Sequence, residues 1–430
     1  MNFGGREGSS IQGYCCYNYA YFKEKEGADR GLQSEKLGGY GMPRYIKYCR
    51  RCVMPETKPD LHIDDEGICS ACRSFERRKD VDWDTRRKEL MEILGRYRSA
   101  DGSNYDCIIP VSGGKDSHSQ AIRMLEFGMN PLCVTASTDT LSDIGRHNIE
   151  NLKNLGVDYI EVTTNPVVRR TINRLALTQV GDISWPEHVT IFTIPVRVAV
   201  QFKVPLIIWG ENSQNEYGGP AGAAENSVLN RRWLEEFGGL LGLRVSDLIG
   251  QEGIEAKNLI QYSYPPDDDL ASVGVTGLFL GYYLPWDGYQ NALLAQAYGF
   301  KTYHKTVEGS LVNYENLDNY QTGIHDYFKF LKFGFGRATD IACLHIRRGR
   351  LSRADGMRLI KKHDGKFPWE YLGCKVEEII EDIGMTLDEF IRVCDRFTNK
   401  KIFVCDSRGN LVKDAQGNLT KINDDNIDAA

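Results

Sequence analysis

The chain of 430 residues has no apolar run long enough to span a bilayer and no signal-peptide pattern, so we expect a cytoplasmic protein with no membrane partner. It also lacks an excess of positive charge. Its 53 Lys and Arg residues face 59 Asp and Glu residues, for a net charge of −6. This balance argues against a protein whose main role is to bind nucleic acid. No internal repeat is visible, which excludes a solenoid.

The 12 cysteines do not indicate an oxidised, secreted protein, because four of them are clustered in two Cys-x-x-Cys pairs. The pairs are Cys49 with Cys52 and Cys69 with Cys72. Each pair places two thiolates on one tight turn, and two such turns complete a tetrahedron around Zn²⁺. This spacing predicts a structural zinc ribbon. A redox-active pair is the alternative, and the presence of both pairs at ribbon spacing disfavours it.

The most informative motif is Ser112-Gly113-Gly114-Lys115-Asp116-Ser117, which directly follows the apolar run 107–111. Adjacent glycines allow successive backbone N–H groups to converge on an anion. The start of a helix and the Lys115 ammonium add positive charge. The motif therefore predicts a phosphate-binding loop. It is not a Walker A loop, because Asp116 stands where Ser or Thr is required and the upstream glycine is missing.

Strand and helix patterns alternate after residue 105, which predicts right-handed βαβ units and an α/β fold with a parallel sheet. We expect strands at 107–111, 132–136, 159–162 and 206–209. Before them, Asp84 is expected to cap a linking helix. In such a sheet a ligand binds at the carboxyl ends of the strands. Two groups of residues follow strands at that edge: Thr135, Ala136 and Ser137, and Gly210, Glu211 and Asn212.

We predict six segments along the chain. These are an extension at 1–41 with no assigned chemistry, a zinc ribbon at 42–80, a linker helix at 81–103, a phosphate-loop domain at 104–260, a sugar-binding helical region at 261–375, and a C-terminal helix, hairpin and tail at 376–430.

Five motifs occur in one order after the ribbon: 112–117, Trp185-Pro186-Glu187-His188, 209–212, Glu216-Tyr217-Gly218-Gly219 and Gly336-Arg337-Ala338-Thr339-Asp340. Together with the ribbon they resemble the N-acetyl sugar amidotransferases of the WbpG/PseA type. These belong to the PP-loop ATP pyrophosphatases, with an N-type, adenine nucleotide alpha hydrolase-like fold. The resemblance covers about residues 45–372.

The resemblance implies that the protein converts an acetamido group on a nucleotide-linked or nonulosonic sugar into an acetamidino group. The product would serve bacterial O-antigen, capsule or flagellin glycan synthesis. Transfer of AMP from ATP to the amide oxygen makes that oxygen a leaving group and releases pyrophosphate. Ammonia then attacks the carbon and displaces AMP.

Catalysis of this kind depends on positioning and on charge neutralisation. We expect Ser112, Gly113, Gly114, Lys115 and Ser117 to hold the phosphates, and Thr135, Ala136, Ser137 and Gly210 to contact ATP. Asp116 and Glu211 are candidate ligands for Mg²⁺, which prefers carboxylate oxygen. A cap on the following helix is an equal alternative for Asp116.

The candidate residues for binding the sugar substrate are those that suit a phosphate or a carboxylate. Arg337, Arg347 and Arg348 are candidates, because arginine binds both groups with paired hydrogen bonds, although surface salt bridging is the alternative for Arg347 and Arg348. His188 could accept protons from ammonia or be structural. Further candidates are Glu187, Asn212 and Lys332.

No cysteine lies in the sequence context of a glutaminase nucleophile. The resemblance implies a separate glutamine amidotransferase pair, similar to the imidazole-glycerol-phosphate synthase subunits, that supplies ammonia. The aromatic second half of the chain would also allow a homodimer.

The alternative function is tRNA thiolation, which uses the same activation of a carbonyl by ATP. Three features count against it. The chain is acidic, no Cys-x-x-Cys pair remains outside the ribbon, and the segment after the fourth expected strand reads Gly-Glu-Asn rather than Gly-His-Asn.

Overall fold

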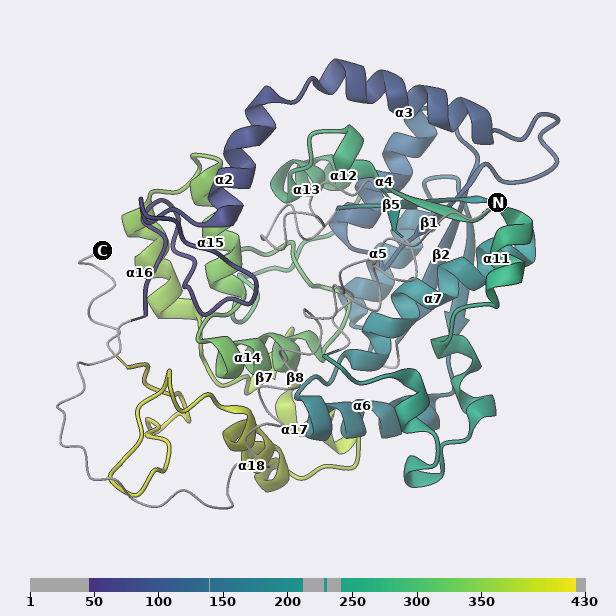
Figure 1. Cartoon of the computed structure of the whole chain (residues 1–430). Coiled ribbons are helices and arrows are strands. Elements are labelled where there is room, and N and C mark those ends of the chain that lie inside the picture. The colour runs from purple at the N-terminus through teal and green to yellow at the C-terminus, as the bar shows by residue number, and fades with distance from the viewer. Residues whose placement is uncertain (1–45, 139, 212–227, 230–240, 423–430) are drawn as a thin grey trace, which may run out of the picture.

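The computed structural model describes residues 46–138, 140–211, 228–229 and 241–422 (Figure 1). The predicted extension at 1–41, Asn212 and the motif at 216–219 lie outside the described residues. Among the helices that are described, none combines the length and apolar character needed to cross a membrane.

A six-stranded sheet forms the centre of the N-terminal half, in the order β3-β2-β1-β4-β6-β5. Five strands are parallel, and β5 pairs antiparallel with β6 at one edge. The strands are β1 (Cys107–Pro110), β2 (Pro131–Ser137), β3 (Asp158–Thr163), β4 (Leu206–Trp209), β5 (Val228–Leu229) and β6 (Thr276–Phe279). The parallel α/β fold predicted from the sequence is confirmed.

Both faces of the sheet are buried, because successive side chains of a strand point to opposite faces and here both sides are apolar. On one face Ile108 and Ile207 pack against the helix α7 (Trp185–Phe202). On the other face Ile109 and Ile208 pack against three helices. These helices are α3 (Trp83–Tyr97), α4 (Lys115–Glu126) and α5 (Asp143–Lys153).

The four expected strands are present within about one residue at each end, since short apolar runs between turn residues specify buried strands well. The sheet continues past the boundary predicted at residue 260, because β6 completes it. The cap of α3 is Asp82 rather than Asp84: the carboxylate of Asp82 accepts a hydrogen bond from the Thr85 amide at 3.1 Å. Two apolar residues of α3, Leu90 and Leu94, are fully buried.

The N-terminal ribbon packs against the C-terminal half of the chain rather than against the sheet (Figure 1). Its four cysteines share an apolar cluster with Ala342 and Cys343 of α15 (Arg337–Arg347) and with Met357 and Ile360 of α16 (Arg353–His363). The helix α2 (Ser70–Arg77) leads from the ribbon toward α3.

A second apolar cluster joins α14 (Thr322–Phe333) to the C-terminal helices and to the end of α6 (Pro166–Val180). The remaining elements of this half are α11 (Asp267–Val273), α12 (Leu280–Tyr283), α13 (Gly288–Ala297), β7 (Glu370–Tyr371), β8 (Cys374–Lys375), α17 (Val376–Glu381) and α18 (Leu387–Phe397). In the tail, antiparallel β-bridges pair Cys405 with Leu411 and Lys413 with Leu419, so the chain reverses direction twice where a hairpin was predicted.

Candidate functional site

The predicted phosphate loop connects β1 to α4 at the carboxyl edge of the sheet. Gly113 has a φ of +85°, and a Cβ there would lie 2.8 Å from Cγ1 of Ile149, so this position favours glycine on two grounds. The Ser112 amide donates to Oγ of Ser117 at 3.0 Å and closes the loop over the first turn of α4. The sequence predicted this local structure, with the helix starting at Lys115 rather than Ser117.

Lys115 lies in the loop with only 7% of its side chain exposed. Its Nζ is 2.7 Å from a carboxylate oxygen of Asp116 and 2.7 Å from Oε1 of Glu315. Burial alone would lower the pKa of Lys115, but the two carboxylates raise it above its usual range, so the ammonium stays charged. Asp116 is fixed in turn by the side-chain amide of Asn291 in α13, at 2.8 Å.

Three residues of this site were not predicted from the sequence: Glu315, Asp318 and Asn291. Burial raises the pKa of Asp318, whose carboxyl group hydrogen-bonds to the Ser112 side chain. Glu315 and Asp318 come from a segment of amide and acidic residues at 313–319 that has no helical or strand period. The polar composition of this segment was the only sequence signal for a functional role, and it does not indicate that these residues contact the loop 112–117. Together with Asp116, these carboxylates give the loop several oxygen ligands suited to Mg²⁺.

At the end of β2, two of the predicted ATP contacts use their side chains within the sheet. Thr135 donates to the Val111 carbonyl at 2.6 Å, and Ser137 donates to Glu161 at 2.7 Å. The backbone of this segment is paired with β3, where Ala136 lies opposite Val162. At Gly210, which follows β4 and precedes Glu211, a Cβ would lie 2.2 Å from Nε2 of Gln120, so the close packing here favours glycine.

The four ribbon cysteines converge as predicted, and their sulfur atoms all lie within 4.8 Å of one another. Sγ of Cys49 is 3.9 Å from Sγ of Cys72, and Sγ of Cys52 is 3.7 Å from Sγ of Cys69. A tetrahedron with Zn–S bonds of about 2.3 Å has sulfur–sulfur edges of about 3.8 Å. The cluster therefore fits a closed Zn²⁺ site with four thiolate ligands.

Arg347 and Arg348, two candidate sugar-binding residues, contact other parts of the protein. Arg347 lies beside the ribbon: burial would lower its pKa, but the nearby thiols of Cys343, Cys52 and Cys72 raise it. Arg348 donates to the Trp286 carbonyl at 3.0 Å and stacks its guanidinium over Phe75 of α2. Arg348 also pairs with Asp287 at 3.5 Å, and a Cβ on the next residue, Gly288, would lie 3.2 Å from Cε of Lys115.

Lys332, on α14, donates from Nζ to the carbonyls of Val180 and Gly181 at 2.8 Å each, so it binds the C-terminal end of α6. Burial lowers the pKa of Lys332 to about 8. Glu187 lies 3.5 Å from Nη1 of the buried Arg169 and accepts from Asn173 at 3.0 Å. Burial raises the pKa of Glu187.

His188, in the first turn of α7, lies against the buried Asp182 with Nδ1 3.2 Å from Oδ2. His325 of α14 approaches the other oxygen of the same carboxylate, at 2.8 Å. The sequence singled out His188 but not its two partners, because nothing in the local pattern connects residues 182, 188 and 325.

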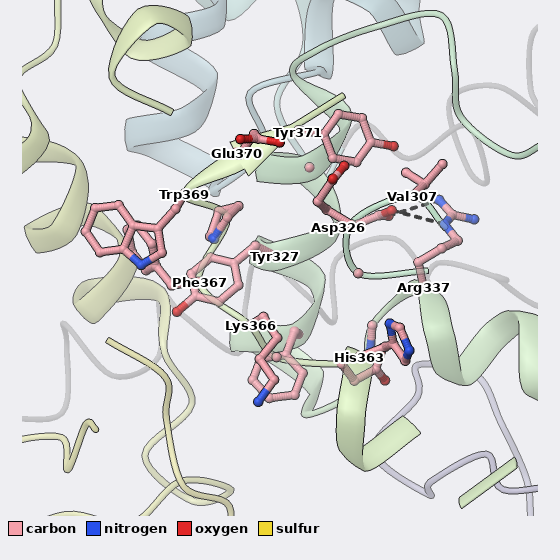
Figure 2. Close-up of a pocket in the computed structure, with 18 of the residues that line it drawn as sticks. Val307, Asp326, Tyr327, Arg337, His363, Lys366, Phe367, Trp369, Glu370 and Tyr371 are labelled. Carbon is pink, nitrogen blue, oxygen red and sulfur yellow. Dashed lines mark hydrogen bonds and ion pairs between the residues drawn. The ribbon is translucent and has the colours of Figure 1, made fainter. Parts of the chain in front are cut away.

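Arg337 lines a cavity of about 520 Å³ in the C-terminal half, shown in Figure 2. Its guanidinium makes two hydrogen bonds to Asp326, at 2.9 and 3.1 Å. The wall combines aromatic, basic and acidic side chains, namely Tyr327, Phe367, Trp369, Tyr371, Lys305, Lys362, His363, Lys366, Glu308, Asp326, Asp364 and Glu370. Among the described residues, Lys305 pairs with Glu308 and Glu370, whereas Lys362 and Lys366 form no ion pair. This mixture is suited to a sugar with an anionic group.

The cavity and the phosphate loop share the segment around Glu315. Asn316, the next residue, accepts from the Tyr371 hydroxyl through its carbonyl at 2.9 Å. With its amide oxygen turned toward Arg337, Asn316 also accepts from Nε and Nη2 at 3.1 Å. Adjacent residues of one segment thus contact Lys115 and the cavity wall.

This architecture defines an α/β protein with a parallel sheet, a glycine loop at its carboxyl edge, a tetracysteine ribbon and a helical C-terminal region. Residues 300–415 match the family model described as LPS biosynthesis protein WbpG-like, C-terminal domain. The match is confined to this region, and there it agrees with the resemblance seen in the sequence. The region contains Glu315, Asp318, Arg337 and His325.

Two further similarities are weaker. The uncharacterized protein MJ1599 of Methanocaldococcus jannaschii is 28% identical over 152 residues, which cover 32% of this chain and 54% of that protein. The chain thus spans about half the length of this curated relative. An NMN synthetase from Francisella tularensis is 16% identical and covers 44% of this chain and 81% of its own, with a TM-score of 0.24, too low to carry an argument.

Proposed function

We propose that the protein is an ATP-dependent amidotransferase that converts an acetamido group of a sugar into an acetamidino group, for lipopolysaccharide or a related surface glycan. One observation carries the proposal. The WbpG-like domain contributes Glu315 to the phosphate loop, 2.7 Å from Lys115, so the two halves of the chain build one site.

In this proposal the loop 112–117 binds the phosphates of ATP, and Lys115 neutralises the charge that develops as pyrophosphate leaves. Asp116 and Glu211, with Glu315 and Asp318 as additional carboxylates, would hold Mg²⁺, which would supply positive charge to offset that of the phosphates. The amide oxygen of the sugar attacks the α-phosphorus of ATP and becomes linked to AMP. Ammonia then adds to the amide carbon, loses protons, and AMP departs with the original oxygen.

The acetamido sugar would bind in the cavity next to Arg337. Its aromatic residues offer faces for a sugar or base ring, and Lys362 and Lys366 offer charge for a phosphate or carboxylate. Arg347, Arg348 and Lys332 already hold other parts of the protein, and we give them no substrate contact in this proposal. A role in nucleic-acid binding is not part of it.

Ammonia would come from a separate glutamine amidotransferase pair. A cytoplasmic location is also part of the proposal, since nucleotide-linked sugars are made in the cytoplasm. A homodimer is a further part of it.

The test is pyrophosphate release by the purified protein with ATP, Mg²⁺ and ammonium ions. A panel of UDP-linked acetamido sugars and nonulosonic acids is compared with bulk tRNA. We expect release that requires one sugar, and a product in which NH replaces O. Release that requires tRNA, with sulfur incorporated when a sulfur donor is added, would reject the proposal in favour of thiolation.

A further inference from the structure

Three potential metal ligands converge outside the phosphate loop and outside the ribbon. Asp182 lies in the turn between α6 and α7, His188 in the first turn of α7, and His325 in α14. One ligand atom from each residue lies within 4.8 Å of the others. Among the described residues, only this group and the four ribbon cysteines meet that criterion.

Contacts hold the three side chains around the Asp182 carboxylate, where Nδ1 of His325 is hydrogen-bonded to Oδ1 at 2.8 Å. The Ser184 amide donates to Oδ1 of Asp182 at 3.0 Å, and only 4% of the Asp182 side chain is exposed. The two imidazole rings lie with their centroids 4.9 Å apart and their planes at 78°. A buried carboxylate therefore holds two imidazoles in different orientations around it.

The contact between His188 and Asp182 lacks the geometry of a hydrogen bond. Nδ1 of His188 is buried and has no hydrogen-bond partner, although Oδ2 of Asp182 is only 3.2 Å away. Ligand atoms bound to one cation at about 2.0–2.1 Å in a tetrahedron are about 3.3 Å apart. The observed separation is that of two ligands of a shared cation, which would also satisfy the buried nitrogen.

We propose that Asp182, His188 and His325 bind a divalent first-row metal ion, separate from the ribbon zinc. Two imidazoles and one carboxylate are a common ligand set for Zn²⁺ and Fe²⁺ sites that keep an open position. The open position is available here, because 29% of the His188 side chain and 28% of the His325 side chain are exposed. Water or a substrate group could reach the ion from that side.

The site lies at the functional end of the molecule. Because α7 leads into β4, its first turn lies at the carboxyl edge of the sheet, the edge of the phosphate loop. His325 is followed directly by Asp326, which pairs with Arg337 in the cavity wall. The metal site rests only on the residues that would bind the ion and does not depend on the proposed reaction.

The test is metal content, measured on the purified full-length protein after incubation with Zn²⁺ and removal of the excess. We expect two ions per chain in the wild type and one in His325→Ala. The exposed His147 of α5 provides the control, and His147→Ala is expected to keep both ions. Cys49→Ser should lose the ribbon ion and keep the new one.

Cobalt substitution separates loss of the site from loss of the fold. Co²⁺ bound to four thiolates gives an intense sulfur-to-metal charge-transfer band, which a site with nitrogen and oxygen ligands does not give. We expect His325→Ala and Asp182→Asn to keep this band while they bind one Co²⁺ fewer. A wild type that binds one ion per chain, or variants that keep both ions, would overturn the proposal. The role of Asp182 would then be to orient the two histidines.

Discussion

Lys115 is one of the residues at which the N-terminal and C-terminal halves meet, because it pairs with Asp116 of its own helix and with Glu315 of the region that matches the WbpG-like model. The sequence predicted Lys115 and its loop, since two glycines between a strand and a helix have few other uses. It could not predict Glu315, because a residue in an irregular segment is brought to the loop only by the packing of α13 on α4.

The Lys115→Ala substitution is expected to lower the rate of pyrophosphate formation by about 10²–10³-fold, because the variant loses the charge that stabilises the leaving phosphates. Steady-state turnover at saturating ATP measures this loss. Lys153→Ala is the matched control, since Lys153 pairs only with Glu150 on the same exposed helix face among the described ion pairs. Equal activity of the Lys115 and Lys153 variants would contradict the role of Lys115.

His345 of α15 is expected to make the free energy of unfolding depend on pH. Burial, aided by Arg350, lowers the pKa of His345 to about 4, and Nε of Arg350 donates to its Nδ1 at 3.1 Å. The folded protein thus holds the neutral ring, while the unfolded chain protonates it near pH 6.5. The free energy of unfolding should therefore fall as pH drops from 6.5 toward 4.

Urea unfolding at several pH values measures this dependence. His345→Asn keeps an acceptor for Arg350 but cannot be protonated, so its stability should fall less steeply over that range. His147→Asn, at an exposed position, should follow the wild type. Identical slopes in all three proteins would contradict the assignment.

At the scale of elements, the strands were the most predictable part, because the four expected ones are short runs rich in apolar residues between turn residues. The strand β6 was missed, since Thr276-Gly277-Leu278-Phe279 is short and follows a segment without strand pattern. The contact of the ribbon with α15 and α16 was also missed. The sequence indicates that four cysteines bind zinc, but not what the closed ribbon packs against.

Arg353 connects the ribbon to α16. Its Nε donates to the carbonyls of Cys52 and Cys49, at 3.0 and 3.4 Å. Arg353→Ala should weaken the docked ribbon by about 1–3 kcal/mol, the cost of removing a charged donor from buried carbonyls. The measurement is the rate of zinc transfer to a chelator, which should rise at least several-fold.

Arg358→Ala is the control on the same helix, because the Arg358 side chain is 77% exposed and pairs with Asp355. It should release zinc at the wild-type rate. A similar rate in both variants would show that Arg353 does not hold the ribbon.

For the whole molecule, the region 300–415 that matches the WbpG-like model contributes residues to the candidate site. It supplies carboxylates to the phosphate loop, lines the cavity beside Arg337 and packs against the ribbon. The sequence predicted the order of these parts along the chain. It did not predict that segments some 200 residues apart, such as the loop 112–117 and the segment 315–318, share one site, because that follows only from tertiary packing.

The central claim is that AMP is transferred to the amide oxygen of a sugar before ammonia attacks. The most direct measurement uses the active sugar with a heavy oxygen isotope in its acetamido group, followed by mass spectrometry of the AMP formed. The account predicts that AMP gains the labelled oxygen and that the sugar product loses it. Unlabelled AMP formed during turnover would contradict the account.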